Sequence, residues 1–272
     1  MTPSTTGEAP NPPPFSLNFG SLVQRREPCL FCITNLFSAG GRQRPPFLPK
    51  VFSCILKGMI TVRTKPVNVY LVRHGETTLN VERVHQASDT KLSERGIAQA
   101  KVVAKRFSYI PVDVIVSSTL KRARQTAEII AGTIQKPVKY STLFVEKKRP
   151  QELEGKRAED PQAVRVKKLI HDHYHDHAWR YAAEENFSDI KHRALKAIRY
   201  LEKIDKENVL VVSHGAFVRA IVSAMAFGLE LKSAEEQTLQ HFLRLNNTGI
   251  SVCKFENEKW ELLAWNDRAH LG

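Results

Sequence analysis

From residue 67 onward, short apolar runs alternate with longer stretches whose apolar positions recur at helical spacing. The short runs are rich in β-branched residues and predict buried strands over 67–72, 112–116 and 208–213. The longer stretches predict helices over 93–107, 119–133, 160–178, 185–205 and 216–227. Residues 138–145 are expected to be extended, and 249–255 and 259–265 to form a closing pair of strands around a turn at Asn257 and Glu258.

The order of these elements predicts the fold class. Strands that alternate with helices favour a mostly parallel central sheet covered on both faces, which is a three-layer α/β/α sandwich. In such sheets ligands bind beyond the carboxyl ends of the strands. Ser93 is the expected N-cap of the first helix, and Ser118 or Thr119 that of the second, because hydroxyl side chains accept bonds from free N–H groups there.

Residues 1–58 differ from the rest of the chain. Ten of the fourteen prolines lie before residue 67, and no hydrophobic periodicity accompanies them. Such a composition buries too little apolar surface to offset the entropy of ordering, so we expect a disordered leader at 1–58 and a domain over 59–272. Three interpretations of the leader stay open: a regulatory tail, an organelle-targeting segment, or a mis-assigned start, with translation beginning at Met59.

The amino-acid composition limits the classes of molecule that the protein is expected to bind. The formal net charge is +13, and long Lys/Arg blocks with interleaved aromatic residues, which would favour nucleic acid, do not occur. No run approaches the roughly 20 apolar residues of a membrane span. A phosphorylated small molecule fits the basic charge, with a solvated basic surface as the alternative. Of the four cysteines, only Cys253 lies in the predicted domain, which suits a reducing compartment and predicts a cytoplasmic protein.

Two predicted strands end in the same way. Arg73-His74-Gly75 follows the first strand and His214-Gly215 follows the strand over 208–213. A single histidine would be explained by capping a strand end, whereas two His-Gly pairs at one sheet edge are hard to explain by packing. Arg73 sets a permanent cation beside His74, and Gly75 allows a tight turn close to a ligand.

The segment after the second strand carries two more cations. Arg122 and Arg124 lie in the first turns of their predicted helix, where the helix dipole favours anions. A bound anion would remove this conflict, and two solvated side chains would remove it as well. Histidines and arginines together can hold a phosphate by charge-assisted hydrogen bonds, and a neutral imidazole is a competent nucleophile towards phosphorus. These residues predict phosphoryl transfer.

At this point the sequence resembles the histidine phosphatase superfamily, also called the phosphoglycerate mutase-like family. Four segments match in the family's order: 71–80 (LVRHGETTLN), 92–96 (LSERG), 117–128 and 209–215. The resemblance covers about residues 66–265 and implies a phosphoglycerate mutase-like fold that needs no metal or other cofactor. The stretch from Glu146 to His214 is shorter than in cofactor-dependent mutases and looks more like the short-cap phosphatase branch, with the cap insertion at about 146–190.

The resemblance also implies roles for single residues. His74 is the residue that becomes phosphorylated, and Glu146 is the expected proton donor. The expected phosphate contacts come from Arg73, Asn80, Gln86, Arg122, Arg124, His214 and Gly215. The chain has Gln86-Ala87 where many members carry Gln-Gly, which weakens the expected contact there. The cations next to Glu146 would lower its pKa, so Glu152 and Glu154 are alternative donors.

The run from His171 to His177 suggests a metal site if it is helical, because two pairs of histidines would then stand four residues apart. A solvated helix end in the variable cap, or contact with substrate, are the alternatives, and we expect no metal. Altogether we expect a histidine acid-type phosphatase, a phosphoric monoester hydrolase with a phosphohistidine intermediate. The alternatives are a phosphoglycerate mutase and a catalytically silent phosphate-binding module, and a homodimer is compatible with each.

Overall fold

The computed structural model describes residues 65–272 of the chain. The expected leader at 1–58 and the alternative start at Met59 lie outside the described residues. Among the described residues no helix is long and apolar enough to span a membrane.

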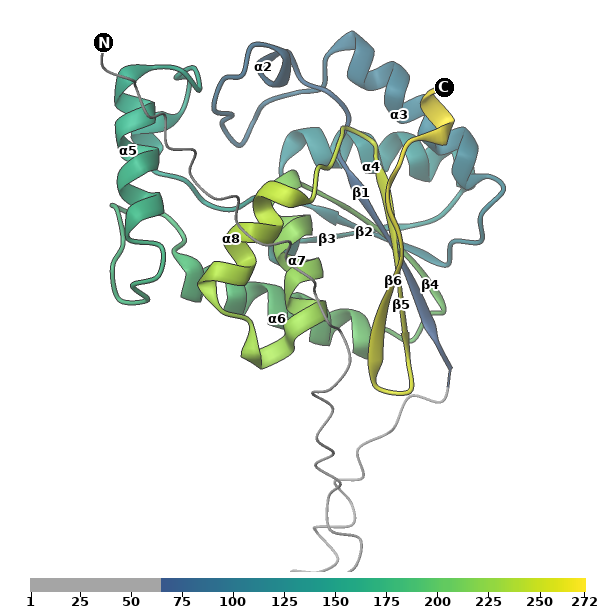
Figure 1. Cartoon of the computed structure of the whole chain (residues 1–272). Coiled ribbons are helices and arrows are strands. Elements are labelled where there is room, and N and C mark those ends of the chain that lie inside the picture. The colour runs from purple at the N-terminus through teal and green to yellow at the C-terminus, as the bar shows by residue number, and fades with distance from the viewer. Residues whose placement is uncertain (1–64) are drawn as a thin grey trace, which may run out of the picture. The chain divides into compact units, whose positions relative to one another are not determined.

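The described residues form a six-stranded sheet in the order β3-β2-β4-β1-β5-β6 (Figure 1). The strands are β1 (Val67–Arg73), β2 (Val114–Ser118), β3 (Val138–Ser141), β4 (Asn208–Ser213), β5 (Ile250–Glu256) and β6 (Lys259–Asp267). The first four in the sheet order are parallel, and β5 and β6 add an antiparallel edge. Asn257 and Glu258 both have positive φ, as a two-residue hairpin turn requires, so the predicted turn is confirmed.

Alternate residues of the central strands supply two separate cores. Val209 and Val211 of β4 pack with helices α6 (Phe187–Lys203) and α7 (Gly215–Phe227). Leu210 and Val212 point the opposite way, towards α3 (Glu94–Phe107) and α4 (Lys121–Ile134). Successive side chains of a strand alternate between the faces of the sheet, so one apolar run can serve both layers. The three-layer α/β/α prediction is confirmed.

Several predicted element boundaries are wrong. Helix α4 has Leu120 as its N-cap, with no side-chain bond, so neither Ser118 nor Thr119 caps it as predicted. Ser118 is the last residue of β2, and its hydroxyl contacts His214 instead. Helix α5 (Pro161–Asp172) ends six residues before the predicted end at residue 178. The residue that follows the helix, His173, stacks its ring on Trp179.

Helix α8 (Ser233–Phe242) was not predicted from the sequence. The hydrophobic periodicity of this helix is weak, because the residue that it buries is Glu236 and not an apolar side chain. The helix packs beside α7 in Figure 1. A carboxylate that replaces an apolar core position removes the periodicity on which sequence prediction depends.

The segment between β3 and α6 contains two short 3₁₀ turns, η4 (Thr142–Phe144) and η5 (Gln151–Leu153), and helix α5. Leu153, Ala163 and Val166 form a small apolar cluster of their own within it. Figure 1 shows α5 at one side of the domain, away from the sheet. This segment is where the sequence places the cap insertion.

Two glycines bring the turn after β1 against the start of α3. An added Cβ on Gly75 would lie 2.5 Å from the carbonyl oxygen of Gly96, and one on Gly96 would lie 2.0 Å from that of Glu76. Ser93 caps α3 as predicted by accepting the N–H of Gly96, and its own backbone N–H donates to Glu76 O. The backbone around His74 is therefore held by direct main-chain packing.

We expect Gly96→Ala to destabilise the domain by roughly 1–3 kcal/mol, because the added methyl group overlaps backbone that has little freedom to shift. Gly132→Ala is the matched control. Gly132 lies inside α4 with open space around it, so its replacement should stabilise the helix by about 0.5–1 kcal/mol. Urea unfolding of the two variants measures both effects, and equal stabilities would contradict the packing argument.

Candidate active site

The pairing of β1 with β4 places the two predicted histidines side by side. Arg73 and Ser213 are register partners in this parallel ladder, so the next residue on each strand, His74 and His214, leaves the sheet at the same level. Their ring centroids are 5.1 Å apart, and both side chains are buried. The prediction that both His-Gly pairs meet at one sheet edge is confirmed by this geometry.

A hydrogen bond from the His74 ring to the backbone shows which of the two ring nitrogens keeps its lone pair. Nδ1 lies 2.7 Å from the carbonyl oxygen of Gly75. A carbonyl oxygen only accepts hydrogen bonds, so Nδ1 carries the proton and Nε2 keeps its lone pair. Burial lowers the pKa of His74 well below 6.5, and the neighbouring His214, Arg122 and Arg73 lower it further. His74 is thus a neutral imidazole with a free nucleophilic nitrogen.

His214 is held from the other side of the pocket by Ser118. Its Nε2 lies 2.7 Å from Ser118 Oγ, which also accepts the N–H of Leu120. Its Nδ1 is buried and has no hydrogen-bond partner among the described residues. Burial, Arg122 and Arg73 lower the pKa of His214 well below 6.5. When Ser118 donates to Nε2, the Nδ1–H group is a free donor for a ligand oxygen.

Arg73 and Arg122 supply permanent positive charge beside the histidines. One terminal nitrogen of Arg73 donates to the carbonyl of Leu245, and one of Arg122 to that of Ala87. In each side chain Nε is buried and unpaired within the described part of the chain. Burial lowers the pKa of both side chains, that of Arg122 to about 10, so Arg122 stays charged at neutral pH. An arginine is not deprotonated in proteins, which keeps Arg73 charged as well. Buried donors normally have partners, so these groups are suited to a ligand that brings oxygens.

The side chain of Glu146 lies at the N-terminus of α7, the helix that begins directly after His214. Its carboxylate accepts the N–H groups of Phe217 at 3.0 Å and Ala216 at 3.3 Å. Burial alone would raise the pKa of this carboxyl, but Arg149, the adjacent N–H groups and Arg122 outweigh it and hold the pKa below its usual value. The structure thus brings Glu146 to the site, as a helix-capping carboxylate that sequence reasoning did not foresee.

Asn80 lies near the turn after β1 and is tied to it by Asn247. Asn247 Nδ2 donates to the carbonyl of His74 at 2.9 Å and to Asn80 Oδ1 at 3.3 Å. The Asn80 side chain also accepts the N–H of Thr77 and closes the capping box of the short helix α2 (Thr78–Val81). Asn247 was not predicted, because a lone asparagine in a loop carries no sequence signal.

Gln86 and Gly215 are the remaining predicted contacts. Gln86 Oε1 is buried and unpaired among the described residues. Gly215 is the first residue of α7, and an added Cβ there would lie 3.6 Å from Arg73 Nε. Gly215 thus lies directly beside one of the pocket arginines, whereas the predicted contact of Gln86 stays a prediction; its neighbour Ala87 accepts from Arg122.

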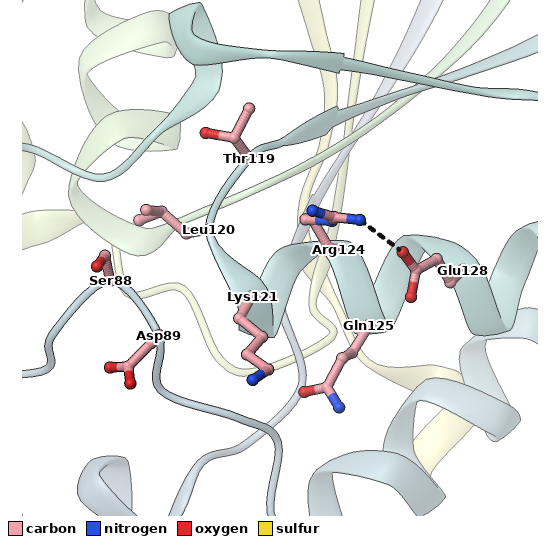
Figure 2. Close-up of a pocket in the computed structure, with 8 residues that line it drawn as sticks. All are labelled: Ser88, Asp89, Thr119, Leu120, Lys121, Arg124, Gln125 and Glu128. Carbon is pink, nitrogen blue, oxygen red and sulfur yellow. Dashed lines mark ion pairs between the residues drawn. The ribbon is translucent and has the colours of Figure 1, made fainter.

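Arg124 is not brought to this group. It lies two residues after the buried Arg122 on α4, and residues two apart on a helix point in nearly opposite directions. Its side chain is half exposed, with Glu128 3.6 Å away and the ring of Tyr140 below the guanidinium. Figure 2 shows Arg124 at the wall of a surface pocket of about 600 Å³ whose lining includes neither histidine. The pair with Glu128 supplies a counter-charge for Arg124, so the conflict with the helix dipole that the sequence raised is left at the buried Arg122.

Two further arginines approach the site and were not predicted. Arg219, on α7, has a terminal nitrogen 3.7 Å from an added Cβ of Gly215, and its Nε donates to Gln240. Arg149 is the cation that lowers the pKa of Glu146 most. Arg219 stands four residues after Gly215, which places it on the same helix face, so its spacing was the available signal.

The histidine run at 171–177 does not form the predicted helical pairs. Since α5 ends at Asp172, His173 and His177 are not one helical turn apart. Their rings pack on Trp179 and Phe187 respectively. Within residues 65–272, no group of three or more His, Cys, Asp or Glu side chains is arranged to hold a metal ion.

Comparison with known proteins agrees with this geometry. The family model described as "Histidine phosphatase superfamily (branch 1)" matches residues 69–268. The chain is 31% identical over 206 residues to the uncharacterized phosphatase PhoE of Bacillus subtilis, covering 75% of this chain and 96% of that protein. It is 30% identical over 218 residues to the probable phosphoglycerate mutase GpmB of Salmonella paratyphi A, covering 75% and 95%.

A solved structure shares the fold over the same region. The phosphoserine phosphatase of Entamoeba histolytica, in complex with 3-phosphoglyceric acid, aligns with a TM-score of 0.61 and 28% identity, over 75% of this chain and 99% of that one. The family model, the relatives and the paired histidines at the sheet edge lead to one conclusion: the chain belongs to the histidine phosphatase superfamily, in its branch 1.

Proposed function

We propose that the chain is a phosphatase, a phosphoric monoester hydrolase of the histidine acid type, whose intermediate is a phosphohistidine on His74. The observation that carries this proposal is the tautomer of His74. Its Nδ1–H donates to Gly75, so Nε2 presents a lone pair near His214 and the guanidinium groups of Arg73 and Arg122. The unpaired Cys253, a buried thiol, supports a reducing compartment such as the cytoplasm.

The first half of the reaction forms the bond between His74 Nε2 and phosphorus while the bond from phosphorus to the ester oxygen breaks. Arg73, Arg122 and the His214 N–H stabilise the charge on the three phosphoryl oxygens, which is where catalysis of phosphoryl transfer mostly acts. Glu146 gives its proton to the departing alkoxide, which leaves as the alcohol. The imidazole, now bonded to phosphorus, keeps the Nδ1 proton held by Gly75.

The second half reverses these roles with water. Glu146, now a carboxylate, takes a proton from a water molecule, whose oxygen bonds to phosphorus as the bond from nitrogen breaks. Inorganic phosphate and neutral His74 result. Before substrate binds, the N–H groups of α7 and the nearby arginines favour ionised Glu146. The negative charge of a bound phosphomonoester opposes these cations and favours uptake of the proton that the first half consumes.

A phosphoglycerate mutase is the second candidate, because a relative over nearly its full length carries that name. The two activities share the phosphohistidine and differ in the acceptor that removes the phosphoryl group. A mutase would convert one phosphoglycerate into another without net release of phosphate. Measuring both isomerisation and released phosphate with 3-phosphoglycerate separates the two functions.

We expect His74→Ala to lose at least about 10³-fold in kcat/KM for p-nitrophenyl phosphate, because the nucleophile is removed. Acid-quenched wild-type protein incubated with a ³²P-labelled monoester should retain label that the variant lacks. His192→Ala is the control, since this histidine is exposed on α6. Wild-type rates in His74→Ala would refute the mechanism, and phosphate binding without any turnover by the wild type would indicate a silent module.

Glu146→Gln should slow hydrolysis of an alkyl phosphate by about 10²–10⁴-fold, because a poor leaving group needs its proton. The loss with p-nitrophenyl phosphate should be at least tenfold smaller, since p-nitrophenolate leaves without one. Glu152→Gln is the comparison, as Glu152 only accepts the hydroxyl of Tyr181. If Glu152→Gln shows the leaving-group dependence and Glu146→Gln does not, the assignment of the acid is wrong.

The lowered pKa values of His74 and His214 predict how the rate responds to acid. An imidazole with pKa 6.5 would be mostly protonated at pH 5.5, and a nucleophilic His74 would lose about tenfold in rate from pH 7.5. Because both pKa values lie well below 6.5, kcat/KM for p-nitrophenyl phosphate should show no such loss over this interval. A pH profile with a midpoint near 6.5 would contradict the neutral pair.

A further inference from the structure

Arg149 lies next to the predicted pocket, and the reaction proposed above uses it only as one of the cations that favour ionised Glu146. It follows Glu146 by three residues in the loop before η5, and its side chain is exposed. Its NH1 group lies 2.9 Å from Nδ1 of His85, in the loop that follows α2. This bond joins two loops far apart in the sequence, next to the backbone bonds of His85 with Gly155 and Lys156.

His85 holds Arg149 as a neutral hydrogen-bond acceptor, so it does not compensate the positive charge of the guanidinium. A guanidinium only donates, so Nδ1 of His85 accepts and the imidazole is neutral with its proton on Nε2. The ring is buried, at 9% exposure, and Nε2 has no partner among the described residues. Burial together with Arg149 and Lys167 lowers the pKa of His85 to about 4. The imidazole thus stays an acceptor at neutral pH and fixes the direction of the guanidinium.

The charges around Arg149 are unbalanced. The carboxylate of Glu146 interacts electrostatically with four arginines: Arg73, Arg122, Arg149 and Arg219. None of these four arginines takes part in an ion pair with another described residue. In the complex that the reaction requires, Glu146 is protonated, the phosphomonoester dianion compensates two of the four cations, and Glu236 lies near Arg219. A fixed positive charge is then left over beside the bound phosphate.

Arg124 is an exposed arginine of the same domain that does have a carboxylate partner, and it serves as a comparison for Arg149. Arg124 has Glu128 on its own helix and Tyr140 beneath it. Arg149 instead donates to a neutral imidazole, and it forms no ion pair with the nearby Glu146 or with another described residue. An arginine that is held in position but not neutralised is suited to bind an anion, because little side-chain entropy remains to be lost.

We propose that Arg149, held by His85, binds a second anionic group of the substrate, so that the preferred substrates are phosphomonoesters that also carry a carboxylate or another phosphate. This inference rests on the phosphatase activity proposed above and specifies its substrate class. The phosphoryl group to be transferred occupies the pocket of His74, and the second anion contacts Arg149 on its exposed side.

Two matched pairs of substrates test this inference with phosphate release as the measurement. 3-Phosphoglycerate and glycerol 3-phosphate differ by a carboxylate in place of a hydroxymethyl group. Fructose 1,6-bisphosphate and fructose 6-phosphate differ by a second phosphate. The quantity compared is the ratio of kcat/KM within a pair for one enzyme preparation, because the fraction of folded enzyme cancels in that ratio.

We expect the wild type to prefer the more anionic member of at least one pair by about tenfold or more, the size of a charge-assisted contact. Arg149→Gln should reduce that preference by about tenfold. Lys148→Gln is the control, because it removes one charge from the exposed neighbour and should leave the ratio unchanged. The pair that shows the preference identifies the second anion as a carboxylate or a phosphate.

Ratios near one in both pairs for the wild type would overturn the inference, and so would a preference that survives Arg149→Gln or falls equally in Lys148→Gln. These outcomes leave the proposed phosphatase intact as long as the wild type hydrolyses p-nitrophenyl phosphate. Failure to release phosphate from any of the five compounds would instead overturn the proposed function, and the inference with it.

Discussion

The in-register parallel pairing of β1 with β4 is the constraint on which the rest of the site depends. Because Arg73 faces Ser213 across the ladder, both chains leave the sheet at one level and their histidines become neighbours. A slip of one residue would turn one of the two strands over and exchange the sides of its core residues. Since β4 is buried on both faces, that slip would exchange side chains between the two cores and disrupt the packing of both, so the core fixes the spacing of the histidine pair.

The same sheet edge explains why the site collects uncompensated charge. Two strands and the start of α4 deliver Arg73, Arg122 and His214, each with a buried side-chain nitrogen that has no partner within residues 65–272. An unpaired buried polar group costs about 1–3 kcal/mol. The large cores on both faces of the sheet offset this cost, and the pocket can hold its donors ready for an oxyanion without reorganising. The free energy that core packing contributes thus compensates for the unpaired donors that are preorganised at the strand ends.

Sequence reasoning located the parts of the site that follow strands and failed where long-range contacts decide. His74, Arg73 and His214 were predictable because short β-branched runs place them at strand ends. Arg122 and Arg124 looked alike in the sequence, and the helix direction that separates them depends on which face of α4 packs on the sheet. Burial and partners such as Asn247 come from segments that lie more than a hundred residues away. No local pattern records such contacts.

The position of Glu146 joins the fold to the chemistry. Its carboxylate serves as a cap that α7 otherwise lacks, since His214 at the N-cap makes no side-chain bond to the helix. Protonation would weaken this cap, because a neutral carboxyl is a poorer acceptor. The proton donor of the proposed reaction is therefore in competition with the helix beside it. A bound phosphomonoester shifts that balance, because its charge both repels the carboxylate and compensates the arginines that stabilise it. In the proposed reaction, proton uptake by Glu146 is then coupled to substrate binding, so that the carboxyl gains its proton when a phosphoryl group is in place to use it.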